Sequence, residues 1–261
     1  MSIPIKSQAE IETMRRSCKL AGDVLVMIEE HVKPGITTEE LDKICHDYII
    51  ANNAIPSCLN YKGYPKSTCI SINHTVCHGI PDGTRLREGD IVNVDVTTFL
   101  DGYHGDNSKT YLVGKTSRAA RDITQAAEDA MWAGIRAIRV GGTFGDIGFA
   151  IQTFTESKGY SVVREYGGHG IGKVFHEDPH VASFGRKGSG PKILPGMVFT
   201  VEPMINQGKR EIILLDDDWT VETEDGKLSA QFEHTVAVHE NGVEIMTYPS
   251  SYTDSRFIEF T

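Results

Sequence analysis

The chain has 261 residues, and its 26 Lys and Arg against 36 Asp and Glu give a formal net charge of −10. An apolar fraction of 39% over this length is typical of globular material with its own core, which excludes a disordered tail or a collagen-like repeat. The acidic balance argues against binding to nucleic acid or to an anionic membrane. We therefore expect one domain over residues 1–261 that binds neither.

The cysteines and the first residues predict the compartment. The five cysteines are an odd number without a Cys-x-x-Cys pair, at Cys18, Cys45, Cys58, Cys69 and Cys77. Reduced thiols are therefore expected, and neither disulfides nor a zinc–thiolate site. The start of the chain has no apolar segment typical of secretion, and no run approaches the ~18 apolar residues of a membrane span. These features predict a cytoplasmic protein.

The first half reads as helices followed by strands. An apolar stripe from Ile11 to Val32 predicts a helix over 8–32. Thr37 and Glu40 form a capping box that starts a second helix near 38–53. The pattern then predicts three strands and a third helix, at residues 69–73, 91–98, 109–113 and 117–140.

The second half repeats this order faintly. The matching residues are Gly35 with Gly141, Thr37 with Thr143, Glu40 with Asp146, Leu41 with Ile147 and Tyr48 with Phe154. Strands are expected at 198–202, 212–215 and 231–238, and a flexible loop at 185–191. Two related α/β halves that face each other would place a site between them.

One carboxylate lies in the middle of an apolar strand. Asp95 falls in Val-Asn-Val-Asp-Val, and Asp101-Gly102 is a two-residue hairpin turn. In that register Asp95 lies opposite Ser108, and Asp106 becomes its diagonal neighbour on the same face. A buried carboxylate costs several kcal/mol unless it is paired or binds a metal. The two aspartates are therefore a candidate cation site, provided that the register holds.

Three more ionisable residues share this setting. His169 lies among four glycines, Glu202 precedes a proline at a strand end, and Glu233 shares a strand face with Gln231 and Thr235. Singly, each has an ordinary structural explanation. Together, four carboxylates and one histidine suit hard or intermediate divalent cations. Their charge balances two such ions, which predicts a dinuclear site with the ions ~3.5–4 Å apart.

These motifs together resemble those of the type I methionine aminopeptidases. The resemblance extends over residues 4–245 and includes three further motifs, Tyr61-Lys62-Gly63-Tyr64-Pro65, Cys77-His78-Gly79-Ile80-Pro81 and Phe175-His176-Glu177. It implies an α+β pita-bread fold, in which two pseudo-symmetric α/β halves surround a curved antiparallel sheet. It also implies hydrolytic removal of the initiator methionine from nascent chains whose second residue is small.

The resemblance implies a role for each matching residue. The ligands of two divalent ions (Co, Mn, Fe or Zn) would be Asp95, Asp106, His169, Glu202 and Glu233. Glu202 would also be the general base for a metal-bridging water, which is the nucleophile. His78 would lie near the substrate amide, and His176 would help to stabilise the tetrahedral intermediate.

The resemblance further implies two binding sites. The pocket for the methionine side chain would comprise Cys58, Tyr61, Tyr64, Cys69, Phe175 and Trp219, whose thiols and aromatic rings suit a thioether. A monovalent cation would bind at Asn73, Thr75 and Ser229. If residues 77–78 are extended, Cys77 and His78 point to opposite faces and form no thiol–imidazole pair. Lys62 departs from the histidine of several bacterial members, and the 185–191 loop is longer and richer in glycine than expected.

The sequence argues against several other classes of protein. Aminopeptidase P and prolidase carry a large extra N-terminal domain, for which there is no room before Asp95. A type II methionine aminopeptidase would need a helical insertion between His169 and Glu202. A non-catalytic relative would lack ligands, and a two-metal phosphatase would need a phosphate-binding loop. The expected partners are a methionine-initiated peptide or nascent chain and, transiently, the ribosome, and we expect a monomer.

Overall fold

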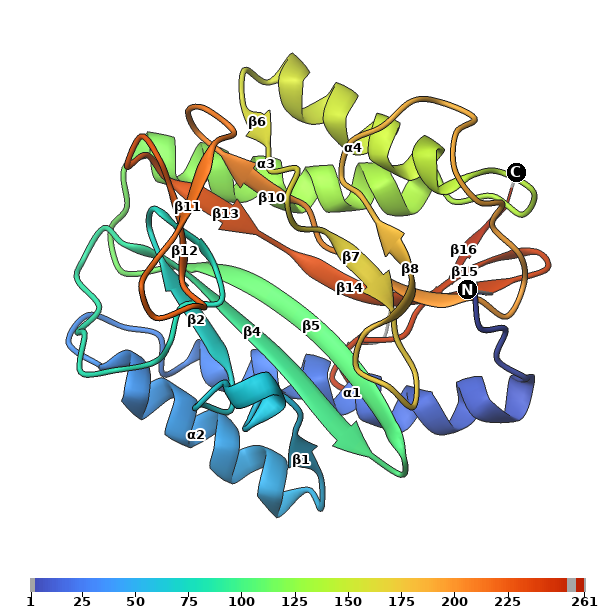
Figure 1. Cartoon of the computed structure of the whole chain (residues 1–261). Helices are drawn as coiled ribbons and strands as arrows, with labels where there is room; N and C mark the ends of the chain where they lie inside the picture. Colours follow the sequence, from blue (N-terminus) through green and yellow to red (C-terminus); the bar gives the residue numbers. More distant parts are fainter. Residues whose placement is uncertain (1–2, 253–256, 261) are drawn as a thin grey trace.

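The computed structural model describes residues 3–252 and 257–260. Figure 1 shows a large curved sheet with two helices at each end of it. Within the described residues the α-helices are α1 (Gln8–Glu29), α2 (Thr38–Ala51), α3 (Arg118–Arg136) and α4 (Phe144–Ser157), and a 3-10 turn, η1, spans Tyr61–Gly63. None of the helices described is both long and apolar enough to cross a bilayer.

Ten of the described strands form the central sheet, in the order β1-β4-β5-β14-β9-β7-β8, with β2 paired to β4 and β15 and β16 extending from β14. The strands of this sheet are β1 (Ile55–Pro56), β2 (Cys69–Ile72), β4 (Ile91–Leu100), β5 (Tyr103–Leu112), β7 (Gly168–Gly170), β8 (Glu177–Val181), β9 (Val198–Val201), β14 (Glu233–His239), β15 (Gly242–Ile245) and β16 (Phe257–Glu259). Its strand pairs are antiparallel.

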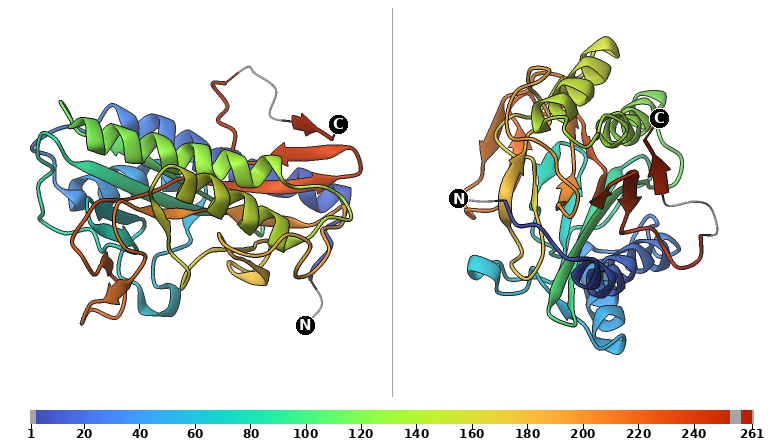
Figure 2. Two further views of the ribbon diagram at one scale, coloured as in Figure 1. Left: turned by 90° about the horizontal axis from the view of Figure 1, so that it is seen from above. Right: turned by 90° about the vertical axis from the view of Figure 1, so that its right-hand side faces the viewer.

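Two small sheets complete the strands of the described chain. Their orders are β13-β10-β6 and β11-β12-β3. The strands are β3 (Thr75–Cys77), β6 (Ser161–Val162), β10 (Met204–Asn206), β11 (Ile212–Leu214), β12 (Val221–Thr223) and β13 (Ser229–Gln231). In both views of Figure 2, α1 and α3 lie together on one face of the central sheet, and the loops of η1 and β11–β12 lie on the other.

The starts of the helices agree with the boundaries predicted from the sequence better than their ends do. The predicted capping box of Thr37 and Glu40 is present, and Thr143 forms the same box with Asp146. The first, second and third predicted helices end at Glu29, Ala51 and Arg136, a few residues early. A capping side chain specifies the first turn directly, whereas the final turns depend on tertiary packing.

The predicted hairpin register is confirmed. Asp101 and Gly102 both have positive φ, as this two-residue turn requires. Asp95 lies opposite Ser108, and Thr97 lies opposite Asp106. The predicted strand 109–113 is too short, because β5 begins at Tyr103: its polar first half is held by the full ladder to β4 rather than by its own strand propensity.

Two further strand predictions need correction. The predicted strand 231–238 is divided into β13 and β14, because Phe232 lies between them with its side chain in the apolar core. The glycine-rich segment around His169 contains β7. A Cβ at Gly168 would overlap the Thr200 carbonyl on β9, so the glycine permits the two strands to approach closely.

The weak repeat corresponds to a structural repeat. An isolated bridge joins Thr37 to Arg85 in the first half, and an equivalent bridge joins Thr143 to Lys192 in the second. The spacing in sequence from Arg85 to Lys192 equals the spacing from Ile91, the first residue of β4, to Val198, the first residue of β9. Each half has its own apolar core, one between α1, α2 and β4, and the other between α3, α4 and β9. The fold is the curved, pseudo-symmetric α+β architecture that the resemblance implied.

Candidate metal centre and substrate pocket

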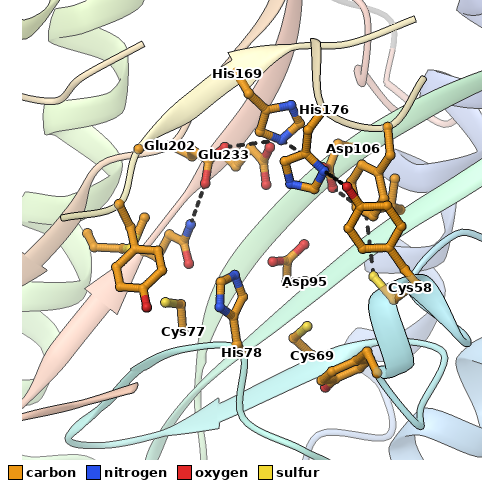
Figure 3. A pocket seen from close by; sticks show the side chains of 18 of the residues that line it. Cys58, Cys69, Cys77, His78, Asp95, Asp106, His169, His176, Glu202 and Glu233 are labelled. Carbon is orange, nitrogen blue, oxygen red and sulfur yellow. Dashed lines mark hydrogen bonds and ion pairs between the residues drawn. The ribbon is translucent and has the colours of Figure 1, made fainter. Parts of the chain in front are cut away.

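Side chains from both halves converge at the centre of the curved sheet. Figure 3 shows Asp95, Asp106, His169, Glu202 and Glu233 around one cavity of about 350 Å³. The ligand atoms of Asp106, His169 and Glu233 all lie within 4.8 Å of one another. His169 Nε2 is 3.6 Å from Asp106 Oδ2 and 3.7 Å from Glu202 Oε1. The five residues predicted as ligands therefore line one site.

Hydrogen bonds orient some of these carboxylates. Thr97 Oγ1 donates to Asp106 Oδ1 at 2.7 Å. Thr200 Oγ1 donates to Glu202 Oε1 at 2.7 Å, and Gln231 Nε2 donates to Glu202 Oε2 at 3.2 Å. Sequence reasoning did not single out these three as site residues. Each lies two positions from a predicted carboxylate ligand, so the two-residue period of a strand could have placed it on the same face.

His169 is held with one ring nitrogen toward the acids. Its backbone N–H donates to Thr200 Oγ1 at 2.9 Å, and its Nδ1 lies 3.0 Å from the Gly170 carbonyl. A proton on Nδ1 makes that bond and leaves Nε2 as the lone-pair nitrogen. Burial lowers the pKa of His169, but the Asp106 hydrogen bond and the Glu202 charge outweigh it and raise this pKa. The ring is thus oriented as a metal-ligating histidine is.

The carboxylates repel one another in a desolvated site. Burial, followed by the charge of Asp106, raises the pKa of Asp95 well above its usual range. The same causes, in the same order, raise the pKa of Glu233, and burial raises that of Glu202. Glu233 Oε1 is buried without a hydrogen-bond partner among the described residues. An unpaired carboxylate oxygen beside three more acids and an imidazole fits a divalent cation.

Two histidines border the acids from opposite sides of the cavity. The His176 ring centroid is 4.1 Å from that of His169, and His176 Nδ1 is 2.9 Å from the Tyr61 hydroxyl. Burial, with the nearby His169 charge, lowers the pKa of His176 to about 3. His78 packs edge-on against Tyr166, and burial lowers its pKa as well. Both imidazoles are therefore neutral hydrogen-bonding groups near neutral pH.

An apolar pocket adjoins the acid cluster. Its buried residues pack in one cluster, which consists of Cys58, Tyr64, Cys69 and Phe175. Tyr61 and Trp219 add partly buried rings to this cluster. The Tyr61 and Phe175 ring centroids are 4.8 Å apart, and those of Tyr64 and Trp219 are 5.1 Å apart. The structure therefore brings together the six residues predicted for the methionine pocket.

The extended geometry considered for Cys77 and His78 is not present. Both side chains line the same cavity (Figure 3). The alternation of an extended strand does not apply, because β3 ends at Cys77 and His78 has a φ of 56°. The cysteines predicted to be reduced are free and buried.

The three residues predicted to bind a monovalent cation lie on neighbouring segments. The Ser229 N–H donates to the Asn73 carbonyl at 2.8 Å, and Thr75 lies at the start of β3. The Asn73 amide donates to Asp90 at 2.8 Å, and the Ser229 hydroxyl donates to Asn206 at 2.8 Å. These two side chains are therefore already hydrogen-bonded to other residues.

Comparison with known proteins places this site in a family. Residues 12–240 match metallopeptidase family M24. The chain is 53% identical over 250 residues to a methionine aminopeptidase of Haemophilus influenzae, covering 95% of this chain and 93% of that one. It is 51% identical over 249 residues to that of Escherichia coli K12, covering 95% and 94%.

Solved structures agree with these sequence matches. The methionine aminopeptidase of Rickettsia prowazekii superposes with a TM-score of 0.93 at 51% identity, covering 94% of this chain and 100% of that one. The prolidase of Pyrococcus furiosus has a TM-score of 0.74 at 22% identity, covering 96% of this chain and 66% of that one, and shows the fold alone.

The fold and the acid cluster are those of a metal-dependent peptidase. The chain belongs to metallopeptidase family M24 and, within it, to the methionine aminopeptidases.

Proposed function

We propose that this chain hydrolyses the peptide bond after an N-terminal methionine when the second residue is small, using two divalent cations. The observation that carries the proposal is the convergence of the acid cluster and a sulfur- and ring-lined pocket in one cavity. An amino terminus at the acids would place the first side chain in that pocket. The family membership and the resemblance both favour this substrate.

The proposed ligands are Asp95, Asp106, His169, Glu202 and Glu233, with cobalt, manganese, iron or zinc as candidate ions. A divalent cation held there lowers the pKa of a bound water and so supplies a nucleophile at neutral pH. The number of ligands and their charge favour two ions. The buried, unpaired Glu233 Oε1 supports its assignment to this set.

Glu202 is the proposed general base. Hydrogen bonds from Thr200 and Gln231 fix its carboxylate in the cavity. A fixed carboxylate whose pKa is raised by burial can accept a proton from the nucleophilic water and deliver it to the leaving amine.

The two neutral histidines are proposed to bind the scissile amide. His176, held at Nδ1 by the Tyr61 hydroxyl, can donate from Nε2 to the oxyanion of the tetrahedral intermediate. His78 lies on the other side of the cavity, where it can contact the substrate amide. Neither ring carries a charge that would compete with the cations for the acid cluster.

The pocket chemistry suits methionine over an aliphatic side chain. Two buried thiols, Cys58 and Cys69, and the Phe175 ring border the space. Contacts between sulfur and an aromatic ring contribute about 0.3–1.5 kcal/mol each. We further propose that Asn73, Thr75 and Ser229 bind a monovalent cation, and that the protein is a cytoplasmic monomer that meets nascent chains transiently at the ribosome.

A matched peptide series tests this specificity. With manganese present, free amino acid release is measured from Met-Ala-Ser, Met-Leu-Ser and Leu-Ala-Ser. We expect rapid release from Met-Ala-Ser alone. Comparable release from Leu-Ala-Ser would contradict the methionine pocket, and comparable release from Met-Leu-Ser would contradict the requirement for a small second residue.

A further inference from the structure

A second cavity lies on the other face of the central sheet. Its volume is about 240 Å³, and it is bordered by α1, α3 and the segment around Tyr248. Its apolar wall includes Leu25, Met131 and Trp132. The metal centre and the methionine pocket do not account for this space.

Strand alternation places this cavity directly behind the metal centre. Asn107 on β5 and His234 on β14 are paired residues, and both line the second cavity. Their chain neighbours, Asp106 and Glu233, belong to the acid cluster. Because successive side chains on a strand point to opposite faces, one pair of strands serves both sites.

The floor of the cavity holds an unused hydrogen-bond acceptor. The Asn107 side chain is in a residue only 4% exposed, and its Oδ1 has no hydrogen-bond partner among the residues described. One ring nitrogen of the neighbouring His234 is already engaged, since Nδ1 lies 2.8 Å from Thr247 Oγ1. A buried acceptor without a donor costs about 1–3 kcal/mol, so a bound molecule that donates to Asn107 would recover that cost.

The walls favour a flat molecule without negative charge, because the lining also carries the carboxylates of Glu128 and Glu233. The Trp132 and His234 ring centroids are 5.4 Å apart, and Tyr248 and Tyr252 add aromatic surface. The one lysine in the lining, Lys109, already pairs with Glu29 at 2.7 Å. No unpaired cation in this lining is therefore available to an anion.

The segment around Tyr248, which forms the outer wall of the cavity, is hydrogen-bonded to α1. The Ser250 N–H and hydroxyl donate to the Asp23 carboxylate at 2.6 and 2.8 Å. A Cβ at Gly22 would overlap the Thr247 carbonyl, so the segment packs directly on α1. The cavity is thus part of the folded structure and is not a gap under a loose strand.

We propose that this second cavity binds a small, uncharged aromatic molecule that carries one O–H or N–H donor, which donates to Asn107 Oδ1. The aromatic ring packs between Trp132 and the apolar side chains of α1. The cavity lies on the opposite face of the sheet from the active-site cavity, with Glu233 in the lining of both, and the proposal does not depend on the proposed function.

Phenol and toluene form a matched pair of probes, because they differ chiefly by the hydroxyl donor. Binding is followed by the Trp132 indole and Asn107 amide NMR signals, with Trp219 reporting on the active-site pocket. We expect both probes to shift Trp132, phenol to bind about tenfold more tightly than toluene, and Trp219 to be unaffected. Equal affinities, or shifts at Trp219 alone, would overturn the proposal.

Two variants sharpen this test. Asn107→Leu keeps the side-chain size and removes the acceptor, so the preference for phenol should disappear or reverse. If that variant does not fold, Val26→Phe on the lining part of α1 fills the space and should abolish binding of both probes. Unchanged phenol binding in either folded variant would show that the probe binds elsewhere.

Discussion

The two halves of the molecule share a scaffold but treat their central carboxylates differently. Asp95 on β4 and Glu202, directly after β9, occupy equivalent positions in the repeat. Glu202 accepts hydrogen bonds from Thr200 and Gln231, whereas the Asp95 carboxylate accepts none from the described residues. Equivalent positions in the repeat therefore yield one carboxylate that is oriented by hydrogen bonds and suited to proton transfer, and one that needs a cation to offset its burial.

The halves also differ in what they add to the cavity. The first half supplies Cys58, Tyr64 and Cys69, which surround the apolar pocket, and the second half supplies His169 and His176. Under the proposed function, the first half therefore contributes most of the side-chain pocket, and the second half contributes two of the histidines at the metal centre, while the acid ligands come from both halves. Substitutions in the two halves should have separable effects.

The largest effect on activity is expected for substitutions at the metal centre, where the two halves meet. Asp106→Asn or Glu233→Ala should lose bound metal and lower turnover by about 1,000-fold or more, because a catalytic cation contributes several kcal/mol of transition-state stabilisation. Metal content by mass spectrometry and methionine release are measured on the same samples, with circular dichroism as the control for folding. Full activity in either variant would remove that residue from the ligand set.

The second-largest effect should distinguish the roles of the two equivalent carboxylates, Asp95 and Glu202. Glu202→Gln should lower kcat by about 10²–10⁴-fold, as expected for loss of a general base. Asp95→Asn should chiefly weaken metal binding, so added manganese should restore more of its activity than that of Glu202→Gln. Equal rescue of the two variants would show that their different surroundings do not assign different roles.

His176→Ala should have a smaller effect. We expect kcat to fall by about 10²–10³-fold, as on removal of one oxyanion donor, with metal content unchanged. Tyr61→Phe, which keeps the ring but loses the hydroxyl that holds His176, is the graded companion and should lose less. Loss of metal from His176→Ala would contradict its place outside the ligand set.

The metal-free protein should be less stable at higher pH. Burial raises the pKa values of Asp95, Glu202 and Glu233 above those of the unfolded chain, so the folded state binds more protons. Stability is then greatest at low pH and is lost as pH rises through the raised pKa values. Thermal melts between pH 5 and 8 should show Tm falling by a few degrees, at about 2–4 °C per kcal/mol.

Bound metal should flatten that trend, because it offsets the same charges. A metal-free Tm that rises with pH across this window would contradict the electrostatic account of the cluster.

The smallest effect is expected at Lys62, an exposed residue of η1 at the cavity rim. Its charge contributes to the lowered pKa of His176. Since exposed charges contribute at most about 1 kcal/mol, Lys62→Gln should change kcat by no more than about fivefold. A larger loss, with the Tyr61 contact intact by crystallography, would assign Lys62 a direct part in substrate binding.

The sequence predicted those features that short-range rules specify. Asp101-Gly102 set the hairpin register that brings Asp95 and Asp106 to one face, and capping residues set the helix starts. It did not predict β7, because the glycine content reflects close approach to β9 and not local strand propensity. It also did not predict the bend at His78, since the positive φ of this residue depends on tertiary contacts.

The most direct test of the account is the dependence of methionine release on metal. Purified protein is stripped with chelator, and release from Met-Ala-Ser is measured with and without added manganese or cobalt. The account predicts a folded, inactive protein that regains activity when either ion is added. Undiminished release after complete removal of metal would contradict the assignment of the carboxylate cluster as the catalytic centre.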